Sequence, residues 1–254
     1  KISYESAQTQ LKGLVESAVT QRLVADVPIG TFLSGGIDSS IITAIAAQHT
    51  KNLNTFSIGF KDEPLFDETK YAQLVANRYK TNHTVFELTN DDLFQNLHEV
   101  LNYIDEPFAD SSALAVNILC FHAKKHVSVA LSGDGADEIF AGYNKHYAEY
   151  QARKLSTFSG IAGMLHPLTK VLPKSRNSLI GNKFRQVDKF IEGIKLTEKD
   201  RYWRWAGFSS DLDSNSLLKD KALEFASRKR AILKEVNSDY NSILKTDMDL
   251  VLEN

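Results

Sequence analysis

The chain has 254 residues, a formal net charge of −2 at pH 7 and 43% hydrophobic residues. This length and composition are typical of a globular protein with one large domain or two small ones. The sequence has no block of lysine and arginine and no apolar run near the ~20 residues of a membrane span, so it favours neither nucleic acid nor a membrane as a partner. The single cysteine, Cys120, leaves no internal disulfide. We therefore expect a reducing, cytoplasmic location and a buried structural thiol.

Apolar periodicity predicts that helices and strands alternate over residues 1–153. The expected elements are a helix near 11–23, a strand 27–33, a buried helix 37–48, a strand 53–60, a helix 68–79 capped by Asp67, a strand 84–88, a helix 91–104, a helix 112–124, a strand 127–131 and one helix from Glu138 to about Arg153. This order predicts an α/β fold with a parallel sheet flanked by helices. Residues 155–178 read as a connecting region, and the pattern from residue 184 onward is helical and charged, with Trp203 and Trp205 as packing anchors. We expect one domain over 1–254, with a nucleotide-binding core over 1–153 and a mostly helical extension over 154–254.

The segment Ser34–Ser40 combines adjacent glycines, hydroxyls and one carboxylate between an expected strand and an expected helix. Gly35 and Gly36 let backbone N–H groups approach an anion closely, and the following helix adds unpaired donors and the positive end of its dipole. Asp38 repels phosphate unless a divalent cation lies between them. The segment therefore predicts a magnesium-pyrophosphate cradle, with a turn and ordinary helix cap as the simpler alternative. It has neither the Walker ending nor the dinucleotide fingerprint, and it resembles the PP-loop of ATP pyrophosphatases, which cleave ATP between its α and β phosphates.

A second glycine loop, Ser132–Glu138, follows the last expected strand and carries more acid. Asp38 and Asp137 are suited to hold Mg²⁺ together, because this ion prefers oxygen ligands. A turn with an N-cap cluster is again the simpler alternative. Since ligands of parallel sheets lie beyond the carboxyl ends of the strands, we expect both loops to face one pocket. A further polar cluster, Asp105–Ser112, precedes an expected helix, and capping by Asp110 or Ser111 explains part of it.

Taken in order, these segments resemble the synthetase domain of glutamine-hydrolysing asparagine synthetases. The matching stretches are Asp26–Ser40, Phe56–Phe60, Phe66–Glu68, Asp105–Leu114 and Leu131–Tyr143. The resemblance implies a PP-loop ATPase fold and an AMP-forming ligase that uses ATP and Mg²⁺. In that chemistry the aspartate side chain attacks the α-phosphorus of ATP to form β-aspartyl-AMP and pyrophosphate, and ammonia then gives asparagine and AMP.

The resemblance also implies roles for individual residues. It places Ser34, Gly35, Gly36, Ser39 and Ser40 on pyrophosphate, Asp38 and Asp137 on Mg²⁺, Leu33, Ile58 and Gly59 beside adenine and ribose, Ser132 and Gly133 near the nucleotide, and Asp134 where ammonia is deprotonated. The family commonly has Glu at the position of Asp134, and the shorter side chain has less reach as a base. Catalytic roles therefore fall to Asp38, Asp134 and Asp137.

Two departures from the family pattern lead us to expect a fragment that alone is weak or inactive. The chain lacks the family's glutaminase domain and its N-terminal cysteine, so ammonia must come from elsewhere. The segment 246–254 resembles the start of a stretch that in the family soon brings a lysine for the α-phosphate, and Lys245 lies upstream of it. The resemblance is compatible with a homodimer.

Other functions remain open at this point. The same ATP loops suit a relative that adenylates another carboxylate, such as a β-lactam synthetase or an amidotransferase acting on a sugar or peptide. A tRNA-modifying PP-loop enzyme is a more distant alternative, and the chain offers neither cysteines for sulfur transfer nor a basic surface. The non-enzymatic alternative is a nucleotide-binding module without turnover.

Overall fold

The computed structural model describes residues 2–105, 110–155, 178–207 and 222–252, together with residues 169, 172, 173, 175 and 216. Residues 106–109 of the polar cluster, most of the expected connecting region and residues 253–254 lie outside the described residues. Contacts divide the chain into two units, Lys1–Asp134 and Gly135–Asn254. This division falls within the second glycine loop, earlier than the boundary expected near residue 153.

The described part of the first unit is built on a four-stranded parallel sheet of order β3-β2-β1-β4. The strands are β1 (Ile29–Phe32), β2 (Asn54–Phe60), β3 (Asn82–Leu88) and β4 (Val129–Leu131). The register pairs Thr31 with both Thr55 and Leu131, and it pairs Thr55 with His83. The expected parallel α/β sheet is confirmed. Because β1 and β4 are adjacent and parallel, the loops that follow them leave the same edge of the sheet.

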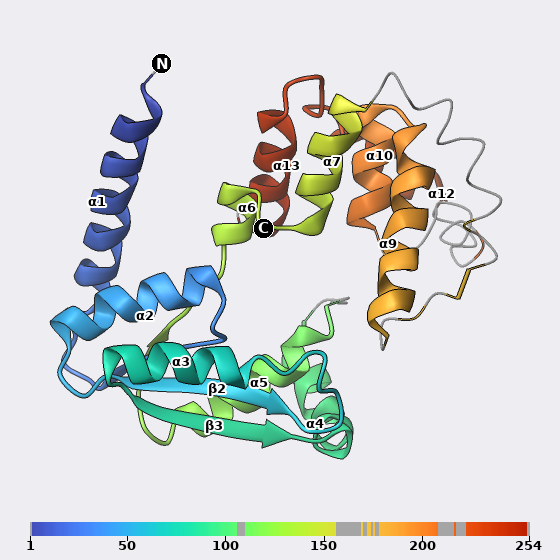
Figure 1. The fold of residues 1–254 in the computed structure, drawn as a ribbon. Coiled ribbons are helices and arrows are strands. Elements are labelled where there is room, and N and C mark those ends of the chain that lie inside the picture. The colour runs from blue at the N-terminus through green and yellow to red at the C-terminus, as the bar shows by residue number, and fades with distance from the viewer. Residues whose placement is uncertain are drawn as a thin grey trace. The chain divides into compact units, whose positions relative to one another are not determined.

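Helices cover both faces of this sheet (Figure 1). The helices of this unit are α1 (Tyr4–Arg22), α2 (Ile37–His49), α3 (Thr69–Tyr79), α4 (Asn90–Tyr103) and α5 (Ser112–Ala123). Helix α1 contacts α2 and projects away from the sheet (Figure 1). Helices α2 and α3 contact the sheet through β1 and β2, whereas α5 contacts β2 and is itself packed against α4. The start of α3 donates a hydrogen bond to the side chain of the expected cap, from the N–H of Thr69 to the carboxylate of Asp67 at 3.0 Å. Asp110 likewise accepts from the N–H of Ser112 at 2.9 Å.

The two faces of the sheet differ in chemistry because successive side chains of a strand point to opposite sides. On the α5 face, Phe56 packs with Leu119 and Ala123 to form an apolar core. The opposite face carries hydroxyls, and the buried Thr31 hydroxyl lies 2.9 Å from that of Thr43 on α2. A layer of hydroxyl groups therefore underlies α2 and α3.

Two burial expectations for the first unit are wrong. Cys120 is exposed, because the buried residues of α5 are Ile118, Leu119 and Ala123, which lie on another side of the helix. The apolar helix α2 is also less buried than expected, and Ile37 is 77% exposed. Its contact with the sheet is made by small side chains instead.

The second unit is helical in its described part. Its helices are α6 (Ala136–Phe140), α7 (Asn144–Lys154), α9 (Leu179–Ile194), α10 (Glu198–Ala206), α12 (Ala222–Ile232) and α13 (Asn241–Val251). The prediction of one helix from Glu138 to Arg153 is wrong, since Ala141 has φ +61° and ends α6. Gly142 then donates its N–H to the carbonyl of Asp137 at 2.9 Å.

The tryptophans of the second unit act as packing anchors, as predicted. Trp203 packs against a core of Tyr202, Leu233, Val236 and Ile243. Trp205 stacks on Phe190 and donates its Nε1–H to the carbonyl of Lys189 at 2.9 Å. None of the described helices combines the length and apolarity needed to cross a membrane.

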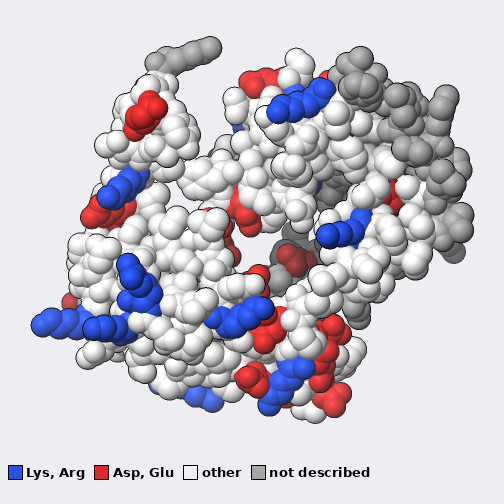
Figure 2. All heavy atoms as spheres, in the orientation of Figure 1, with Lys and Arg blue, Asp and Glu red and all other residues white. Residues whose placement is uncertain are grey.

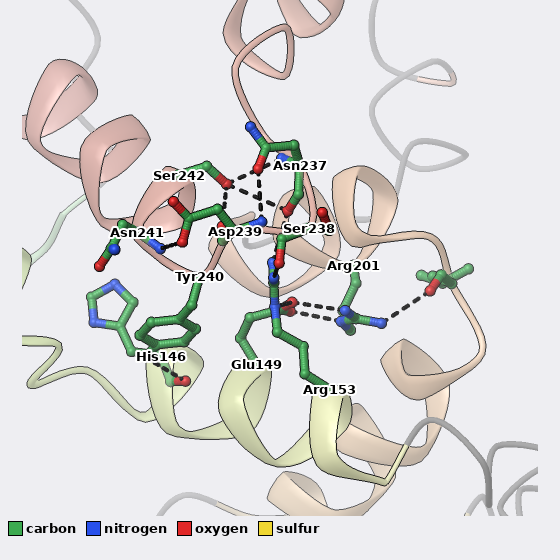
Figure 3. A network of polar contacts seen from close by, with 11 residues as sticks. His146, Glu149, Arg153, Arg201, Asn237, Ser238, Asp239, Tyr240, Asn241 and Ser242 are labelled. Carbon is green, nitrogen blue, oxygen red and sulfur yellow. Dashed lines mark hydrogen bonds and ion pairs between the residues drawn. The ribbon is translucent and has the colours of Figure 1, made fainter.

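A buried ionic network joins α7 to α10 and to the turn before α13 (Figure 3). Glu149 accepts hydrogen bonds from Arg153 at 2.7 Å and from the fork of Arg201 at 2.6 and 2.7 Å. Arg153 also donates hydrogen bonds to the carbonyls of Asn237 and Ser238. Buried charges require such pairing, because an unpaired charge away from water is strongly destabilising. The network therefore fixes how these helices pack.

Candidate active site

The first glycine loop, residues 33–36, connects β1 to α2 and is shaped by Gly35. This residue has φ +85°, a region that side chains other than glycine rarely adopt. A Cβ atom there would also lie 2.4 Å from the backbone nitrogen of Ala72 on α3. Glycine is therefore required at this position both by conformation and by the close approach of α3.

Hydroxyl groups hold the interior of this loop. The Oγ of Ser39 accepts from the N–H of Ser34 at 3.3 Å, lies 3.0 Å from the Oγ of Ser34 and donates to the carbonyl of Gly36 at 3.3 Å. Ser39 is only 8% exposed. Ser34 is exposed, and Asp38 and Ser40 are partly exposed on the first turn of α2. Helix α2 begins at Ile37, and its N-cap residue Gly36 provides no side-chain cap. The start of a helix has unpaired N–H groups that can bind an anion.

The first half of the second loop meets the first loop within the same unit. A Cβ on Gly133 would lie 2.7 Å from the backbone nitrogen of Ser39 and 3.0 Å from the carbonyl carbon of Asp38. The backbone at Gly133 therefore rests on the first turn of α2. Nearby, Ser132 donates its hydroxyl to the carboxylate of Asp134 at 2.8 Å, and Asp134 is exposed. Gly133 and the first turn of α2 are therefore adjacent, and the expectation that both loops face one pocket stays a prediction.

The residues expected beside adenine and ribose lie at the ends of β1 and β2. Leu33 is 1% exposed and packs against Ala72 and Ala76 of α3. Ile58 is partly buried, and Gly59 is buried with Thr69 Cγ2 3.1 Å from where its Cβ would be. The role of Leu33 beside adenine and ribose stays a prediction, because the whole residue is buried in this structure.

The acidic half of the second loop belongs to the second unit. A Cβ on Gly142 would lie 1.8 Å from Oδ1 of Asp137, so glycine makes room for this carboxylate. Glu138 is 2% exposed and accepts a hydrogen bond from the hydroxyl of Tyr143 at 2.7 Å. Burial, together with the hydrogen bond and charge of Glu138, raises the pKa of Tyr143. Tyr143 therefore remains a hydrogen-bond donor at neutral pH.

The predicted magnesium pair divides between the units, with Asp38 in the first and Asp137 in the second. Within the described ranges, no cluster of three or more His, Cys, Asp or Glu side chains has the placement of a metal centre. The joint role of this pair stays a prediction. Among the described residues on the face drawn in Figure 2, basic and acidic side chains are interspersed.

Comparison with known proteins shows the family of the chain. The sequence model of the family described as "Asparagine synthase" matches residues 10–250. The chain belongs to the asparagine synthase family. It is 40% identical over 167 residues to a putative glutamine-hydrolysing asparagine synthetase 2 of Methanocaldococcus jannaschii, which covers 63% of this chain and 32% of that protein. It is 34% identical over 210 residues to asparagine synthetase 1 of Bacillus subtilis, covering 78% of this chain and 33% of the relative.

The chain thus spans about a third of the length of these curated asparagine synthetases. A structural comparison matches an NH3-dependent NAD synthetase of Campylobacter jejuni with a TM-score of 0.38 and 13% identity, covering 98% of this chain and 95% of that one. A likeness at that level carries no argument about function.

The asparagine synthase motif around Phe56–Phe60 also contains a group that sequence reasoning missed. Ser57 on β2 donates its hydroxyl to the carbonyl of Leu33, and His83 on β3 lies beside it with Nε2 at 3.4 Å. Burial lowers the pKa of the His83 imidazole, against the opposing effect of a hydrogen bond with the Thr55 backbone. The only sequence signal was the position of Ser57 inside a family motif, since its partners are 24 and 26 residues away.

Proposed function

We propose that this chain is the ATP-using part of an asparagine synthetase. It would bind Mg-ATP at the two glycine loops, transfer AMP to the side-chain carboxylate of aspartate with release of pyrophosphate, and allow ammonia to displace AMP. The observation that carries the proposal is the junction of β1, the loop around Gly35 and the uncapped start of α2, with Gly133 resting on the same helical turn. Membership of the asparagine synthase family supports this assignment.

Each part of the proposed site has a physical task. The N–H groups at the start of α2 would bind pyrophosphate oxygens. Ser34 is exposed beside them, and its hydroxyl would exchange its contact with Ser39 at 3.0 Å for one with the pyrophosphate. Ser39 would shape the loop, because its hydroxyl is already engaged with Ser34 and Gly36. Activation as an acyl adenylate makes sense because AMP is a far better leaving group for an amine than a carboxylate oxygen.

The acidic residues fit a magnesium ion in their chemistry. Mg²⁺ binds through one or two carboxylates together with substrate phosphates, and Asp38 and Asp137 are the carboxylates that we assign to it. The ion would neutralise charge on the pyrophosphate as it leaves. Asp134, held by Ser132 at 2.8 Å, is the residue that we assign to take a proton from the attacking ammonia.

The test measures Mg-ATP binding and pyrophosphate release by the chain, with aspartate and a panel of other carboxylic acids, each with and without ammonium. We expect Mg-ATP to bind. We expect pyrophosphate release to be weak in this chain alone, to depend on aspartate, and to be accompanied by asparagine when ammonium is present. Asp38→Ala should weaken Mg-dependent nucleotide binding by at least about tenfold, since one metal carboxylate is lost. Nucleotide affinity that stays unchanged in this variant with Mg²⁺ present contradicts the cradle assignment.

The remaining outcomes separate the proposal from its alternatives. Release with another acid moves the chain to a sister ligase with the same fold and mechanism. Binding without release across the whole panel indicates a nucleotide-binding module for this chain. Absence of Mg-ATP binding overturns the proposed function.

A further inference from the structure

The peptide bond between Leu33 and Ser34, where β1 enters the first glycine loop, is held on both of its polar sides. Its carbonyl accepts the hydroxyl hydrogen of Ser57 from β2. Its N–H donates to the Oγ of Ser39 on α2 at 3.3 Å. The preceding N–H, that of Leu33, is a sheet donor to the carbonyl of Phe56 at 2.8 Å. The peptide cannot rotate about its neighbouring dihedral angles without losing hydrogen bonds on both sides.

We call the two contacts of the Leu33–Ser34 peptide, with Ser57 and with Ser39, the clamp. On the carbonyl side of the clamp, side chains of β2 and β3 continue from Ser57 at hydrogen-bonding distances. Because the Ser57 hydroxyl donates to Leu33, its oxygen can accept from Nε2–H of His83, 3.4 Å away. The Nδ1 of a neutral His83 with this tautomer then accepts from the hydroxyl of Thr55 at 2.9 Å. The oxygen of Thr55 in turn accepts from Thr81 at 2.9 Å. Each of these side chains is thereby satisfied as donor or acceptor.

Ser57 is 4% exposed and lies beneath the loop. It acts on the loop through the Leu33 carbonyl. A buried carbonyl that loses its hydrogen-bond partner is costly in free energy. The conformation of the Leu33–Ser34 peptide therefore depends on the Ser57 hydroxyl, and an apolar side chain at that position could not replace it.

We propose that Ser57, supported by His83, is a positioning residue that holds the Leu33–Ser34 peptide and so keeps the first glycine loop in its phosphate-binding shape. The link to phosphate rests on the proposed function, whereas the clamp itself rests only on the contacts within the first unit. Pre-organisation of this kind raises affinity because the loop does not have to be ordered when the ligand binds.

Ser57→Ala tests both parts with separate readouts. Amide hydrogen exchange, followed by NMR, should be about tenfold faster at the N–H of Ser34 in the variant. The N–H of Leu33 should stay protected, because its ladder bond to Phe56 is retained. Affinity for Mg-ATP should fall by about tenfold, a change equivalent to loss of one hydrogen bond.

Thr43→Val is the matched control. It removes a buried hydroxyl that pairs with Thr31, whereas the hydrogen bonds of the Leu33–Ser34 peptide are made by Ser57 and Ser39. It should lower global stability without changing exchange at Ser34 or Mg-ATP affinity. His83→Phe is the second variant: it removes the Nε2–H donor but leaves the Ser57 hydroxyl, so it should change the same two readouts in the same direction and by less.

Unchanged exchange at Ser34 in Ser57→Ala overturns the clamp. Faster exchange with unchanged Mg-ATP affinity overturns the positioning role. If Ser57→Ala and Thr43→Val change exchange at Ser34 and Mg-ATP affinity equally, the positioning role is also overturned, because the changes then reflect only a loss of global stability. If the unaltered chain does not bind Mg-ATP, the proposed function fails, and exchange at Ser34 still decides the clamp.

Discussion

At the scale of single residues, close approach of backbones decides where glycine is required. Gly35 combines a positive φ with a position against the start of α3, and Gly133 lies against the first turn of α2. By contrast, Gly13 lies in α1 with nothing within 4 Å of an added Cβ. The chain therefore offers a matched pair of glycine substitutions.

We expect Gly35→Ala to lower the free energy of unfolding by about 2–4 kcal/mol and to abolish Mg-ATP binding, since strain and a backbone clash coincide there. Gly13→Ala should instead raise the free energy of unfolding by about 0.5–1 kcal/mol, because glycine is a poor residue inside a helix. Chemical denaturation and nucleotide titration measure both effects. Normal Mg-ATP affinity in Gly35→Ala would contradict the assigned loop geometry.

At the scale of elements, α13 is attached to α7 and α10 through one buried carboxylate. Asp247 is 1% exposed and lies 2.5 Å from Nε2 of His146, 2.8 Å from Nζ of Lys145 and 2.5 Å from the hydroxyl of Tyr202. Burial favours the neutral acid, but the hydrogen bonds from these partners outweigh it and lower the pKa of Asp247. The ionised form therefore stabilises the folded second unit.

Since the pKa of Asp247 is lower in the folded chain than its ordinary value of 3.8, its contribution is complete above that value and is lost as the pH falls through the lowered pKa. Asp247→Asn should cost about 3–5 kcal/mol at pH 7, because Lys145 loses its buried counter-charge. The difference in the free energy of unfolding between the unaltered chain and Asp247→Asn should become smaller below about pH 4. Denaturant unfolding from pH 7 to pH 3 measures it, and a pH-independent difference would refute this account.

At the scale of the whole molecule, the magnesium proposal takes one carboxylate from each unit. If Asp38 and Asp137 bind the same ion, their effects on Mg-dependent ATP affinity are coupled. We expect each single alanine variant to weaken affinity by at least about tenfold, and the double variant to be little worse than either one. A double-mutant cycle by nucleotide titration at several Mg²⁺ concentrations provides the measurement. Additive effects indicate that the two residues act independently.

Most features near the first loop could be predicted because their causes are local in the chain. Apolar periodicity indicated the strands and helices of the first unit, and the glycines with hydroxyls at Ser34–Ser40 indicated a phosphate loop before α2. Adjacent glycines, a following helix and alternation of strands with helices are read within a few residues. Their parallel arrangement then brings the ends of β1 and β4 to one edge.

Some features depend on strand register and on packing between elements, and only the tertiary structure decided these. The helix breaks at Ala141 because this residue has a left-handed backbone conformation, which apolar periodicity does not predict. The exposure of Cys120 depends on which side of α5 packs against the sheet. The clamp by Ser57 and His83 requires β1, β2 and β3 in one register. By itself the sequence determined the fold class and the position of the first glycine loop between β1 and α2, because local spacing encodes both. Only the folded chain decided which buried groups support that loop, because those partners are far apart in sequence and meet only in the sheet.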